Sequence, residues 1–283
     1  CPLCEACCGL EVRTQGKKII SIRGAEQDVF SHGYICPKGV SLKDLHEDPD
    51  RLRTPLIKRD GQFVEASWEE AFAEIHKRLP PLIAAHGSDT VGCVVGNPVA
   101  HKIGLLAYFP RLVRAIGTRN IFSASSLDQI PKQLSSGLMF GDWNAVAVPD
   151  IERTDFMLIL GANPMVSNGS LWTVPDYRGK ARAMRARGGR IVVVDPRRTE
   201  TAAQGDMHIP IKPGGDAFFL LGLVHTLFAE NWVRLGHLEP HLAGLEALQQ
   251  AVLAFSPERM ARGCGIDAGA QRAIARELAQ AQR

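Results

Sequence analysis

Apolar positions along the chain follow two rhythms that alternate. Short, nearly continuous apolar runs that end in Gly, Pro or Asp predict buried strands, and apolar residues spaced three and four apart predict the helices between them. The predicted strands are residues 10–12, 19–22, 90–95, 155–160, 191–194 and 209–211, and the predicted helices are residues 68–80, 101–116, 175–187 and 217–229. Strands and helices that alternate in this way predict an α/β fold with a doubly wound, mostly parallel sheet.

The first of these helices has a clear start. Ser67 is followed three residues later by Glu70, which is the spacing of a capping box, and the apolar positions Ala71, Ile75 and Leu79 come next. Because proline lacks the backbone N–H that continues a helix, we expect this helix to end near Pro80.

The cysteines crowd at the front of the chain. Five of the seven lie within the first 36 residues, and Cys93 and Cys264 stand alone. Cys1, Cys4 and Cys8 have the spacing C-x2-C-x3-C, and Cys36 follows in a separate loop. A disulfide framework would spread its cysteines and usually serves a shorter chain, so this pattern instead indicates a metal site.

Three thiolates within eight residues and a fourth from a distant loop suit a [4Fe–4S] cluster held by Cys1, Cys4, Cys8 and Cys36. Structural zinc is the alternative, but it tends to use two paired C-x2-C knuckles, and Cys36 has no cysteine partner nearby. A further alternative is that the cysteines are incidental. We expect a cluster-holding lobe over residues 1–55 and an incomplete α/β region over residues 56–283.

Composition excludes several classes of protein. The 283 residues include 33 Lys and Arg and 30 Asp and Glu, so the net charge is only +3, with no basic block. This argues against a nucleic-acid or membrane-surface protein. The longest apolar runs are far below the ~20 residues that span a bilayer, so no direct membrane span is expected. Since the chain starts at Cys1 and stops in a helix-like stretch, we expect it to be a fragment of a longer chain.

Three loops that follow predicted strands carry polar residues and glycines: residues 161–164, 195–199 and 212–216. In open α/β sheets, ligands bind beyond the carboxyl ends of the strands. None of the loops has the G-x-G-x-x-G or the Walker pattern. Asn163 and Ser167 can donate to phosphates, Asp195 can accept from ribose hydroxyls, and Asp216 can accept from a guanine edge. Each loop alone is also typical of an ordinary turn; together they favour a bound nucleotide.

These motifs, in this order, resemble those of the molybdopterin oxidoreductase family. The resemblance rests on Cys-Pro-Leu-Cys at the start, Cys-Pro-Lys-Gly at 36–39, Gly-Ala-Asn-Pro at 161–164, Asp-Pro-Arg-Arg-Thr at 195–199 and Lys-Pro-Gly-Gly-Asp at 212–216, and it runs to about residue 232. The bis-molybdopterin guanine dinucleotide group of this family includes formate dehydrogenases, nitrate reductases and thiosulfate or polysulfide reductases. Its members are much longer.

The resemblance implies roles for particular residues. Cys1, Cys4, Cys8 and Cys36 would ligate the cluster, and Lys38 would lie on the electron path between cluster and pterin. The alternative for Lys38 is a surface lysine in a turn. The residues implied to hold the guanosine and pyrophosphate of one pterin are Asn163, Ser167, Asp195, Arg197, Thr199, Gly214 and Asp216.

The protein ligand of the metal is a separate prediction. In the family it is Cys, selenocysteine, Ser or Asp at the start of a helix, before a Phe-Gly-like pair. Placing Phe140-Gly141 on that landmark puts Asp128 at the ligand position. The alternative is that Asp128 caps a helix that starts near Pro131. The absence of Cys or selenocysteine here, and Gln129 in place of His, count against formate oxidation.

The resemblance therefore implies a molybdenum- or tungsten-dependent oxidoreductase that acts on a small-molecule substrate and exchanges two electrons with it. The cluster would pass these electrons singly to a partner subunit or carrier. The expected compartment is the cytoplasm, with export to the periplasm left open because the front of the chain reads as trimmed. One rival is a metal-free iron–sulfur electron-transfer subunit of a respiratory complex with the same fold; another is a zinc-stabilised binding module.

Overall fold

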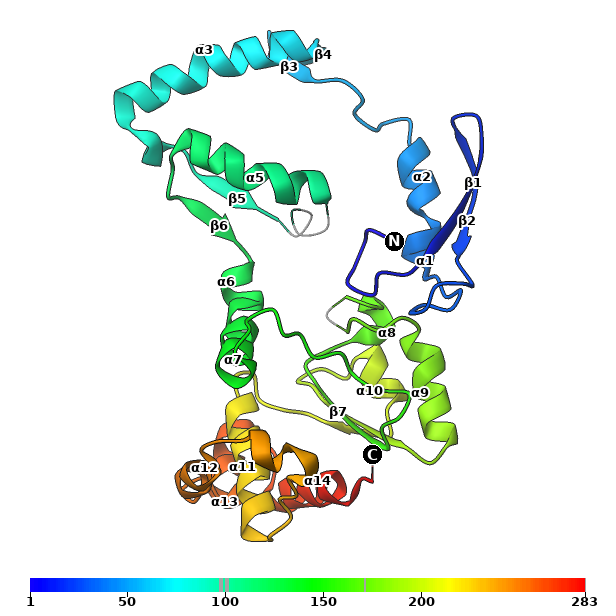
Figure 1. Cartoon of the computed structure of the whole chain (residues 1–283), viewed down its shortest axis with the longest axis vertical. Helices are drawn as coiled ribbons and strands as arrows, with labels where there is room; N and C mark the ends of the chain where they lie inside the picture. The colour runs from blue at the N-terminus through cyan, green and yellow to red at the C-terminus, as the bar shows by residue number, and fades with distance from the viewer. Residues whose placement is uncertain (97–98, 100–101, 171, 283) are drawn as a thin grey trace. The chain divides into compact units, whose positions relative to one another are not determined.

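The chain forms two compact units, residues 1–147 and residues 148–283 (Figure 1). A computed structural model describes residues 1–96, 99, 102–170 and 172–282. Asn97 and Pro98, which were expected in a turn, lie outside the described residues. The expected division after residue 55 falls within the first unit and stays a prediction.

The first unit contains two antiparallel hairpins and one pair of parallel strands, with helices between them. Its elements are β1 (Leu10–Gln15), β2 (Lys18–Gly24), α1 (Pro37–Val40), α2 (Leu42–Glu47), β3 (Leu56–Arg59), β4 (Gln62–Glu65), α3 (Trp68–His86), β5 (Cys93–Val95), α5 (Ile103–Ile116), β6 (Ile121–Ser123), α6 (Ser125–Asp128) and α7 (Ile130–Phe140).

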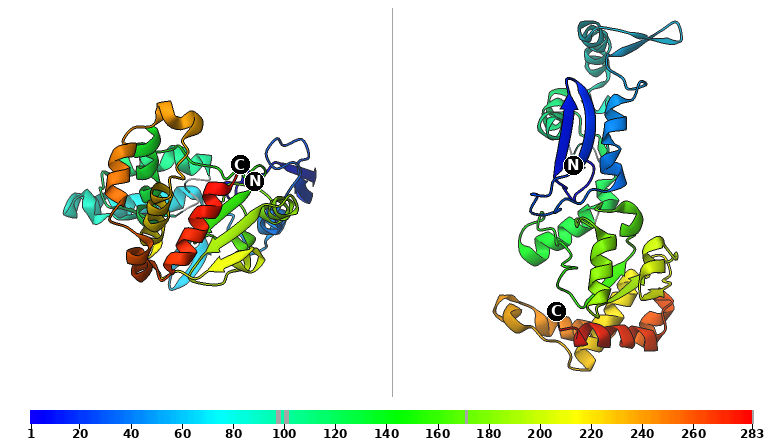
Figure 2. Two further views of the ribbon diagram at one scale, coloured as in Figure 1. Left: turned by 90° about the horizontal axis from the view of Figure 1, so that it is seen from below. Right: turned by 90° about the vertical axis from the view of Figure 1, so that its right-hand side faces the viewer.

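The lobe at the front is built on the first hairpin. β1 pairs with β2 from Leu10 opposite Gly24 to Gln15 opposite Lys18. The hairpin lies beside α2, as the right-hand view of Figure 2 shows, and the Ile19 backbone N–H donates to Glu47 Oε1 at 2.8 Å. The hairpin and the two short helices thus form one small body around the cysteine-bearing segments.

The capping box predicted at the start of α3 is confirmed. The Glu70 backbone N–H donates to Ser67 Oγ at 3.1 Å, and the Ser67 backbone N–H donates to Glu70 Oε2 at 2.9 Å. The predicted end of this helix is wrong, because α3 continues through Pro80 and Pro81 to His86.

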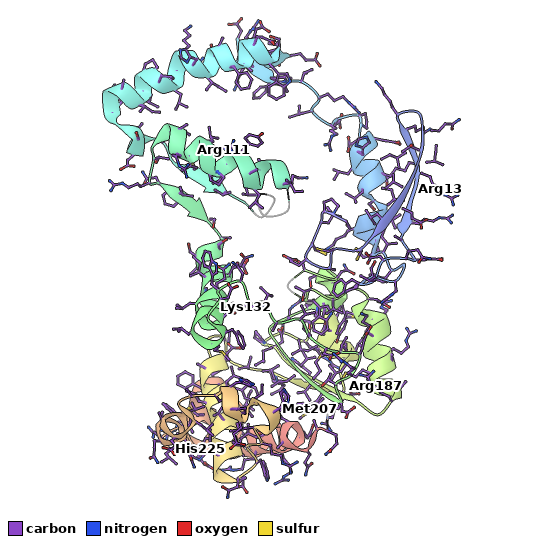
Figure 3. The ribbon with its side chains drawn as sticks, viewed as in Figure 1. Arg13, Arg111, Lys132, Arg187, Met207 and His225 are labelled. Atoms are coloured by element: carbon purple, nitrogen blue, oxygen red, sulfur yellow. The ribbon has the colours of Figure 1, made fainter. Side chains whose placement is uncertain are left out.

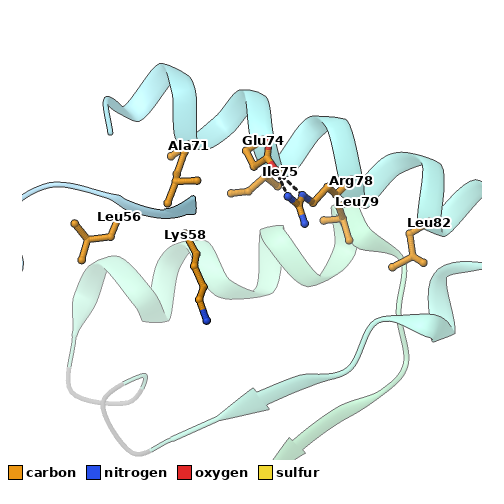
Figure 4. Close-up of a pocket in the computed structure, with 9 residues that line it drawn as sticks. Leu56, Lys58, Ala71, Glu74, Ile75, Arg78, Leu79 and Leu82 are labelled. Atoms are coloured by element: carbon orange, nitrogen blue, oxygen red, sulfur yellow. Dashed lines mark hydrogen bonds and ion pairs between the residues drawn. The ribbon is translucent and has the colours of Figure 1, made fainter. Parts of the chain in front are cut away.

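An apolar stripe runs along α3 on both sides of its prolines. Ile75 and Leu79 lie before the prolines and Leu82 after them, at helical spacing, and all three line one open groove beside β3 (Figure 4). None of these side chains is buried, with Ile75 53% and Leu82 44% exposed, and nothing in the structure explains why the helix continues past the prolines. The groove holds about 580 Å³, and its two charged groups on α3, Glu74 and Arg78, are paired with each other.

The second unit is a three-stranded parallel sheet followed by a group of helices. Its elements are β7 (Phe156–Leu160), α8 (Pro164–Ser167), α9 (Tyr177–Ala186), β8 (Arg190–Val194), α10 (Glu200–Gln204), β9 (Met207–Ile209), α11 (Asp216–Ala229), α12 (Leu245–Val252), α13 (Pro257–Cys264) and α14 (Ala268–Gln280). The strand order is β7-β8-β9.

Both faces of this sheet are covered, as the unbroken apolar runs predict. Successive side chains of a strand point to opposite faces. In β8, Val192 and Val194 pack with α11, α13 and α14, whereas Ile191 and Val193 pack with α9 and α10. All four side chains are at most 1% exposed. The predicted α/β fold with parallel strands and crossover helices is confirmed.

The third strand lies two residues earlier than predicted. Val192 is opposite Met207 and Val194 is opposite Ile209, so β9 is Met207–Ile209 and not 209–211. Pro210 ends the pairing, because proline has no N–H to donate to the neighbouring strand. Ile211 is still buried in the core, and this explains why the apolar run looked like a longer strand.

Polar contacts fix the ends of two helices in this unit. Arg187, at the end of α9, donates through Nη2 to the carbonyl oxygens of Ile151 (2.6 Å) and Thr154 (2.9 Å), just before β7. On α11, a ring nitrogen of His225 is 3.0 Å from the Val252 carbonyl oxygen at the end of α12. Figure 3 labels both side chains. Within the described residues no helix is long and apolar enough to span a bilayer.

Replacing Phe219 should measure how far the second unit depends on its helix-covered core. Phe219 is fully buried among β8, β9 and α14. We expect Phe219→Ala to lower the free energy of unfolding by about 3–5 kcal/mol in urea titrations, because it leaves a cavity. The matched control is the neighbouring Leu220→Ala, whose side chain is 42% exposed and should cost about 1 kcal/mol or less. Equal losses for the two variants would contradict the described core.

Candidate cofactor sites

The cysteines predicted as cluster ligands come together in the front lobe. Cys8 is buried, and burial followed by the neighbouring thiols of Cys4 and Cys36 raises the pKa of its thiol above the ordinary value of 9.0. The backbone nitrogen of Cys1 lies 2.5 Å from the Cys8 carbonyl oxygen. The stretch of residues 1–8 and the loop that carries Cys36 thus lie near each other.

Gly39 shows how closely the segments pack. A Cβ at this position would lie 3.8 Å from Cys1 Sγ and only 2.8 Å from Ile35 Cγ1, so a side chain larger than hydrogen has no room. Cys36 precedes α1 as its N-cap, and its carbonyl oxygen accepts from the Gly39 N–H at 3.0 Å. The Cys-Pro-Lys-Gly sequence therefore forms a tight turn that brings Cys36 and Cys1 to the same small volume.

The thiol set fits a cluster better than a single ion. Thiolates on one zinc, each at about 2.3 Å from it, must lie within ~4 Å of one another. Among the residues that the structure describes, no three His, Cys, Asp or Glu side chains form such a set. A cubane binds each thiolate to a different iron and so tolerates a wider spacing. The thiols of Cys4 and Cys36, which disfavour ionisation of the buried Cys8, also suit a cationic iron core, because such a core favours the thiolate forms.

Asp28, which the sequence analysis did not single out, is hydrogen-bonded through Ser31 to Gly9, the residue after Cys8. Asp28 Oδ2 accepts from the backbone N–H and from Oγ of Ser31, each at 2.6 Å, and Ser31 Oγ accepts from the Gly9 N–H at 3.1 Å. The Ser31 hydroxyl, followed by its N–H, holds the pKa of Asp28 below its usual range. An Asp followed three residues later by Ser was the signal available in the sequence, since the short polar side chain of Asp bonds nearby backbone N–H groups.

Lys38 lies on α1 two residues after Cys36 and is exposed. Its place next to a cysteine ligand agrees with the implied position near the cluster. The role of Lys38 in electron transfer stays a prediction.

The three polar loops of the second unit lie at one edge of its sheet, as predicted. β7, β8 and β9 are parallel, so the chain leaves each strand at the same edge. The first residue of each of the first two loops is bonded to the end of the neighbouring strand, since Gly161 N donates to the Val194 carbonyl oxygen of β8 at 3.0 Å and Asp195 N donates to the Ile209 carbonyl oxygen of β9 at 3.2 Å.

Asn163 and Ser167, which were expected to donate to phosphates, are engaged within the protein. Asn163 Oδ1 accepts from Thr201 Oγ1 at 2.7 Å, and its Nδ2 donates to Glu200 Oε2 at 2.8 Å. Ser167 Oγ donates to the Asn163 carbonyl oxygen at 3.1 Å. These side chains join the first loop to α10. Their contact with a ligand stays a prediction. In the structure, both side chains form hydrogen bonds within the protein.

Asp195, Arg197 and Thr199 form the second loop. Asp195 is 7% exposed, and its Oδ1 accepts from the Arg197 N–H at 2.8 Å. Thr199 is buried as the N-cap of α10, where its Oγ1 accepts from Ala202 N at 3.1 Å. Only Arg197 of the three extends into solvent, with its side chain 69% exposed and 3.9 Å from Glu200 Oε2.

The first and third loops leave open space beside backbone. Gly161 and Gly214 have φ of +61° and +78°, and nothing lies within 4 Å of a Cβ built at either one. A ligand can therefore approach the backbone closely at both places. Asp216, the first residue of α11, is exposed and can accept hydrogen bonds from a ligand. This combination fits a nucleotide with its phosphates.

The position of Asp128 differs from both expectations. The ligand hypothesis placed it at the start of a helix, and the alternative placed it at a helix N-cap. It is the last residue of α6, not at the start of a helix, and the N-cap of α7 is Gln129. The capping alternative is wrong for this reason. The side chain of Asp128 is exposed and makes no hydrogen bond or ion pair with the described residues. Its role as metal ligand stays a prediction.

Two family models match the chain in succession. Residues 1–47 match the molybdopterin oxidoreductase Fe4S4 domain, and residues 51–236 match the molybdopterin oxidoreductase model. The chain belongs to the molybdopterin oxidoreductase family. A [4Fe–4S] cluster and a molybdopterin with molybdenum or tungsten are accordingly its cofactors. The thiol set of the front lobe fits the first, and the open loop edge of the sheet fits the second.

Similar proteins support the same assignment. The chain is 27% identical over 94% of its length to the alpha subunit of an F420-dependent formate dehydrogenase of Methanocaldococcus jannaschii, and it covers 38% of that protein. It is 29% identical over 99% of its length to a menaquinone reductase, molybdopterin-binding-like subunit of Nitratidesulfovibrio vulgaris, covering 39%. Acetylene hydratase from Pelobacter acetylenicus shares the fold, with a TM-score of 0.75 at 24% identity over 97% of this chain and 37% of the hydratase.

The neighbouring thiols Cys7 and Cys8 should differ in reactivity when the lobe holds no metal. Cys7 is exposed and Cys8 is buried with a raised pKa. Since the thiolate is the nucleophile, we expect iodoacetamide at pH 8 to modify Cys7 faster than Cys8, as followed by fragmentation mass spectrometry. Urea-unfolded protein is the control, in which the two rates should converge. Equal rates in the folded protein would contradict the described burial.

Proposed function

We propose that this chain takes part in the two-electron oxidation or reduction of a small substrate at a bis-molybdopterin guanine dinucleotide metal centre, with electrons relayed through the [4Fe–4S] cluster. The observation that carries the proposal is the pairing, in one chain, of a four-thiol lobe with a parallel sheet whose three polar loops share one edge. The metal supplies two-electron redox chemistry, and the protein supplies binding and orientation.

The chain's own residues divide this work. Cys1, Cys4, Cys8 and Cys36 hold the cluster. Arg197, which is exposed beside Glu200, can pair with a pyrophosphate, and the exposed Asp216 can accept from a guanine edge. The open backbone at Gly161 and Gly214 admits phosphate oxygens to hydrogen-bond distance of main-chain groups.

Asp128 supplies the protein ligand of the metal in this proposal. An exposed carboxylate without a partner among the described residues is available to a cation, and a hard oxygen ligand favours high-valent metal more than a thiolate does. This ligand is the reason to place nitrate-type or other oxygen-atom chemistry ahead of formate oxidation. The cytoplasm stays the expected compartment, and a partner subunit or carrier would take the electrons.

The test is elemental analysis of the matured protein purified without oxygen. About four irons and one molybdenum or tungsten per chain support the proposal. Dye-linked assays with formate, nitrate and thiosulfate then identify the substrate class. Iron without molybdenum or tungsten, in protein that was matured correctly, would refute it.

A second candidate is an electron-transfer subunit that has lost the metal. The identity to the menaquinone reductase subunit, whose name is molybdopterin-binding-like, favours it. Against it stand the polar side chains of the loop edge, since Arg197 and Asp216 remain exposed and available. The same elemental analysis separates the two candidates.

The adjacent cysteines offer a matched pair for the cluster. We expect Cys8→Ala to lose the cluster, with iron falling from about four per chain to below one, because it removes a buried ligand. Cys7→Ala is the control and should keep about four irons, since Cys7 is exposed and lies outside the ligand set. Iron and visible absorbance of anaerobic protein measure both. Iron loss in Cys7→Ala alone would reverse the assignment.

The role of Asp128 as metal ligand can be tested with a control variant on the same helix. We expect Asp128→Ala to keep its pterin while turnover falls at least about tenfold, which corresponds to ~1.4 kcal/mol in the activation barrier. The electron paramagnetic resonance spectrum of the metal should change as well, because a ligand is lost. Ser126→Ala, an exposed change on α6, is the control. An unchanged metal spectrum in Asp128→Ala would exclude direct ligation.

A further inference from the structure

The loop of residues 212–216 rests on the end of a helix far along the chain. Lys212 N donates to the Cys264 carbonyl oxygen at 2.9 Å, and Lys212 Nζ donates to the Arg262 carbonyl oxygen at 3.1 Å. The last carbonyl groups of a helix lack partners within it, and a cation is favourable there. The Lys212 side chain therefore caps α13, so the loop is attached by its first residue.

Two glycines make this attachment close. A Cβ on Gly215 would lie 2.8 Å from Cys264 Cα, and a Cβ on Gly265 would lie 3.0 Å from Lys212 Cγ. Gly265 ends α13 with φ of +77°, a conformation that disfavours other residues. The loop and the turn after α13 are thus in van der Waals contact, and a shift in one moves the other.

Gln271, on α14, fixes that turn from the opposite side. It is 0% exposed, and its Nε2 donates to the Ile266 carbonyl oxygen at 2.8 Å and reaches Cys264 Sγ at 3.5 Å and the Pro257 carbonyl oxygen at 3.4 Å. Gln271 Oε1 is buried with no hydrogen-bond partner among the described residues, so the contacts of Nε2 alone hold the carboxamide.

Gly222 on α11 makes room for this amide. A Cβ at Gly222 would lie 2.0 Å from Gln271 Oε1. Glycine inside a helix is less favourable than alanine, so its presence here has a packing reason. Helices α11 and α14 and the turn after α13 thus all pack against the carboxamide of Gln271.

We propose that Gln271 is a positioning residue for the 212–216 loop. It holds the turn between α13 and α14, on which Lys212 is docked, and so determines where Gly214 and Asp216 stand at the sheet edge. The part of this inference that concerns the cofactor rests on the proposed function, in which these two residues meet the nucleotide end of the pterin.

Hydrogen exchange in the full chain tests the positioning directly. Gln271→Met keeps the length of the side chain and removes its donor, and we expect the Lys212 and Gly215 amides to exchange about tenfold faster. Gly222→Ala, which displaces the carboxamide, should have the same effect. Thr226→Val is the matched control, because it removes a buried hydroxyl from α11 that donates to the Gly222 carbonyl oxygen within the same helix. It should leave the two loop amides unchanged.

Lys212→Met extends the test to the loop side of the contact and, as a change in an exposed side chain, avoids loss of folding. Loop exchange in the Lys212→Met/Gln271→Met double variant should be less than additive, because both changes release the same contact. Additive effects would overturn the inference, as would loop exchange in Gln271→Met equal to that in Thr226→Val. If Gln271→Met does not fold, Gly222→Ala and Lys212→Met decide.

Pterin content per chain separates the two parts of the inference. One part is that Gln271 holds the loop, and the other is that the loop position matters for the cofactor. Faster loop exchange together with several-fold lower pterin content supports positioning for the cofactor. Faster exchange with unchanged pterin refutes the link to the cofactor. A complete absence of pterin from the unaltered matured protein refutes the proposed function, and the exchange of the Lys212 amide still decides whether Gln271 holds the loop.

Discussion

The parallel pairing of β8 with β7 on one side and β9 on the other is the constraint on which the second unit depends. Because the three strands run the same way, every loop that follows them emerges at one edge. The alternation of Ile191 and Val193 with Val192 and Val194 commits β8 to two cores at once. A slip of one residue would exchange these faces, so the positions of the loops are as firmly determined as the cores.

In the front lobe, folding is coupled to the ionisation of one thiol, that of Cys8. Burial, then Cys4 and Cys36, raise the pKa of Cys8, so the folded lobe holds this proton more tightly than the unfolded chain. Its contribution to metal-free stability is present below pH 9.0 and is lost as pH rises through the higher folded pKa. Iron changes this balance, since it binds the thiolate, and the folding of the lobe becomes linked to cluster binding.

Sequence patterns predicted what local rules determine. The capping box at Ser67 and the buried run of β8 follow from residue spacing, and both are present. The end of α3 could not be predicted from Pro80, because the helix contains both Pro80 and Pro81 and continues to His86. Asn163 presents the same limit at the candidate site: its type suits phosphate, yet only the fold shows that Thr201 and Glu200 engage it.

That limit separates two kinds of polar residue at the sheet edge. The side chains of Asn163 and Thr199 form hydrogen bonds with α10. These bonds fix the backbone from which Arg197 extends. A binding edge needs both kinds, since a ligand gains most from groups that are held in place before it arrives. The 212–216 loop follows the same logic through different means, because Lys212 is used as an anchor and Gly214 is left open. Some residues whose type suits ligand binding therefore hold the backbone in place instead, and their neighbours are left to bind the ligand.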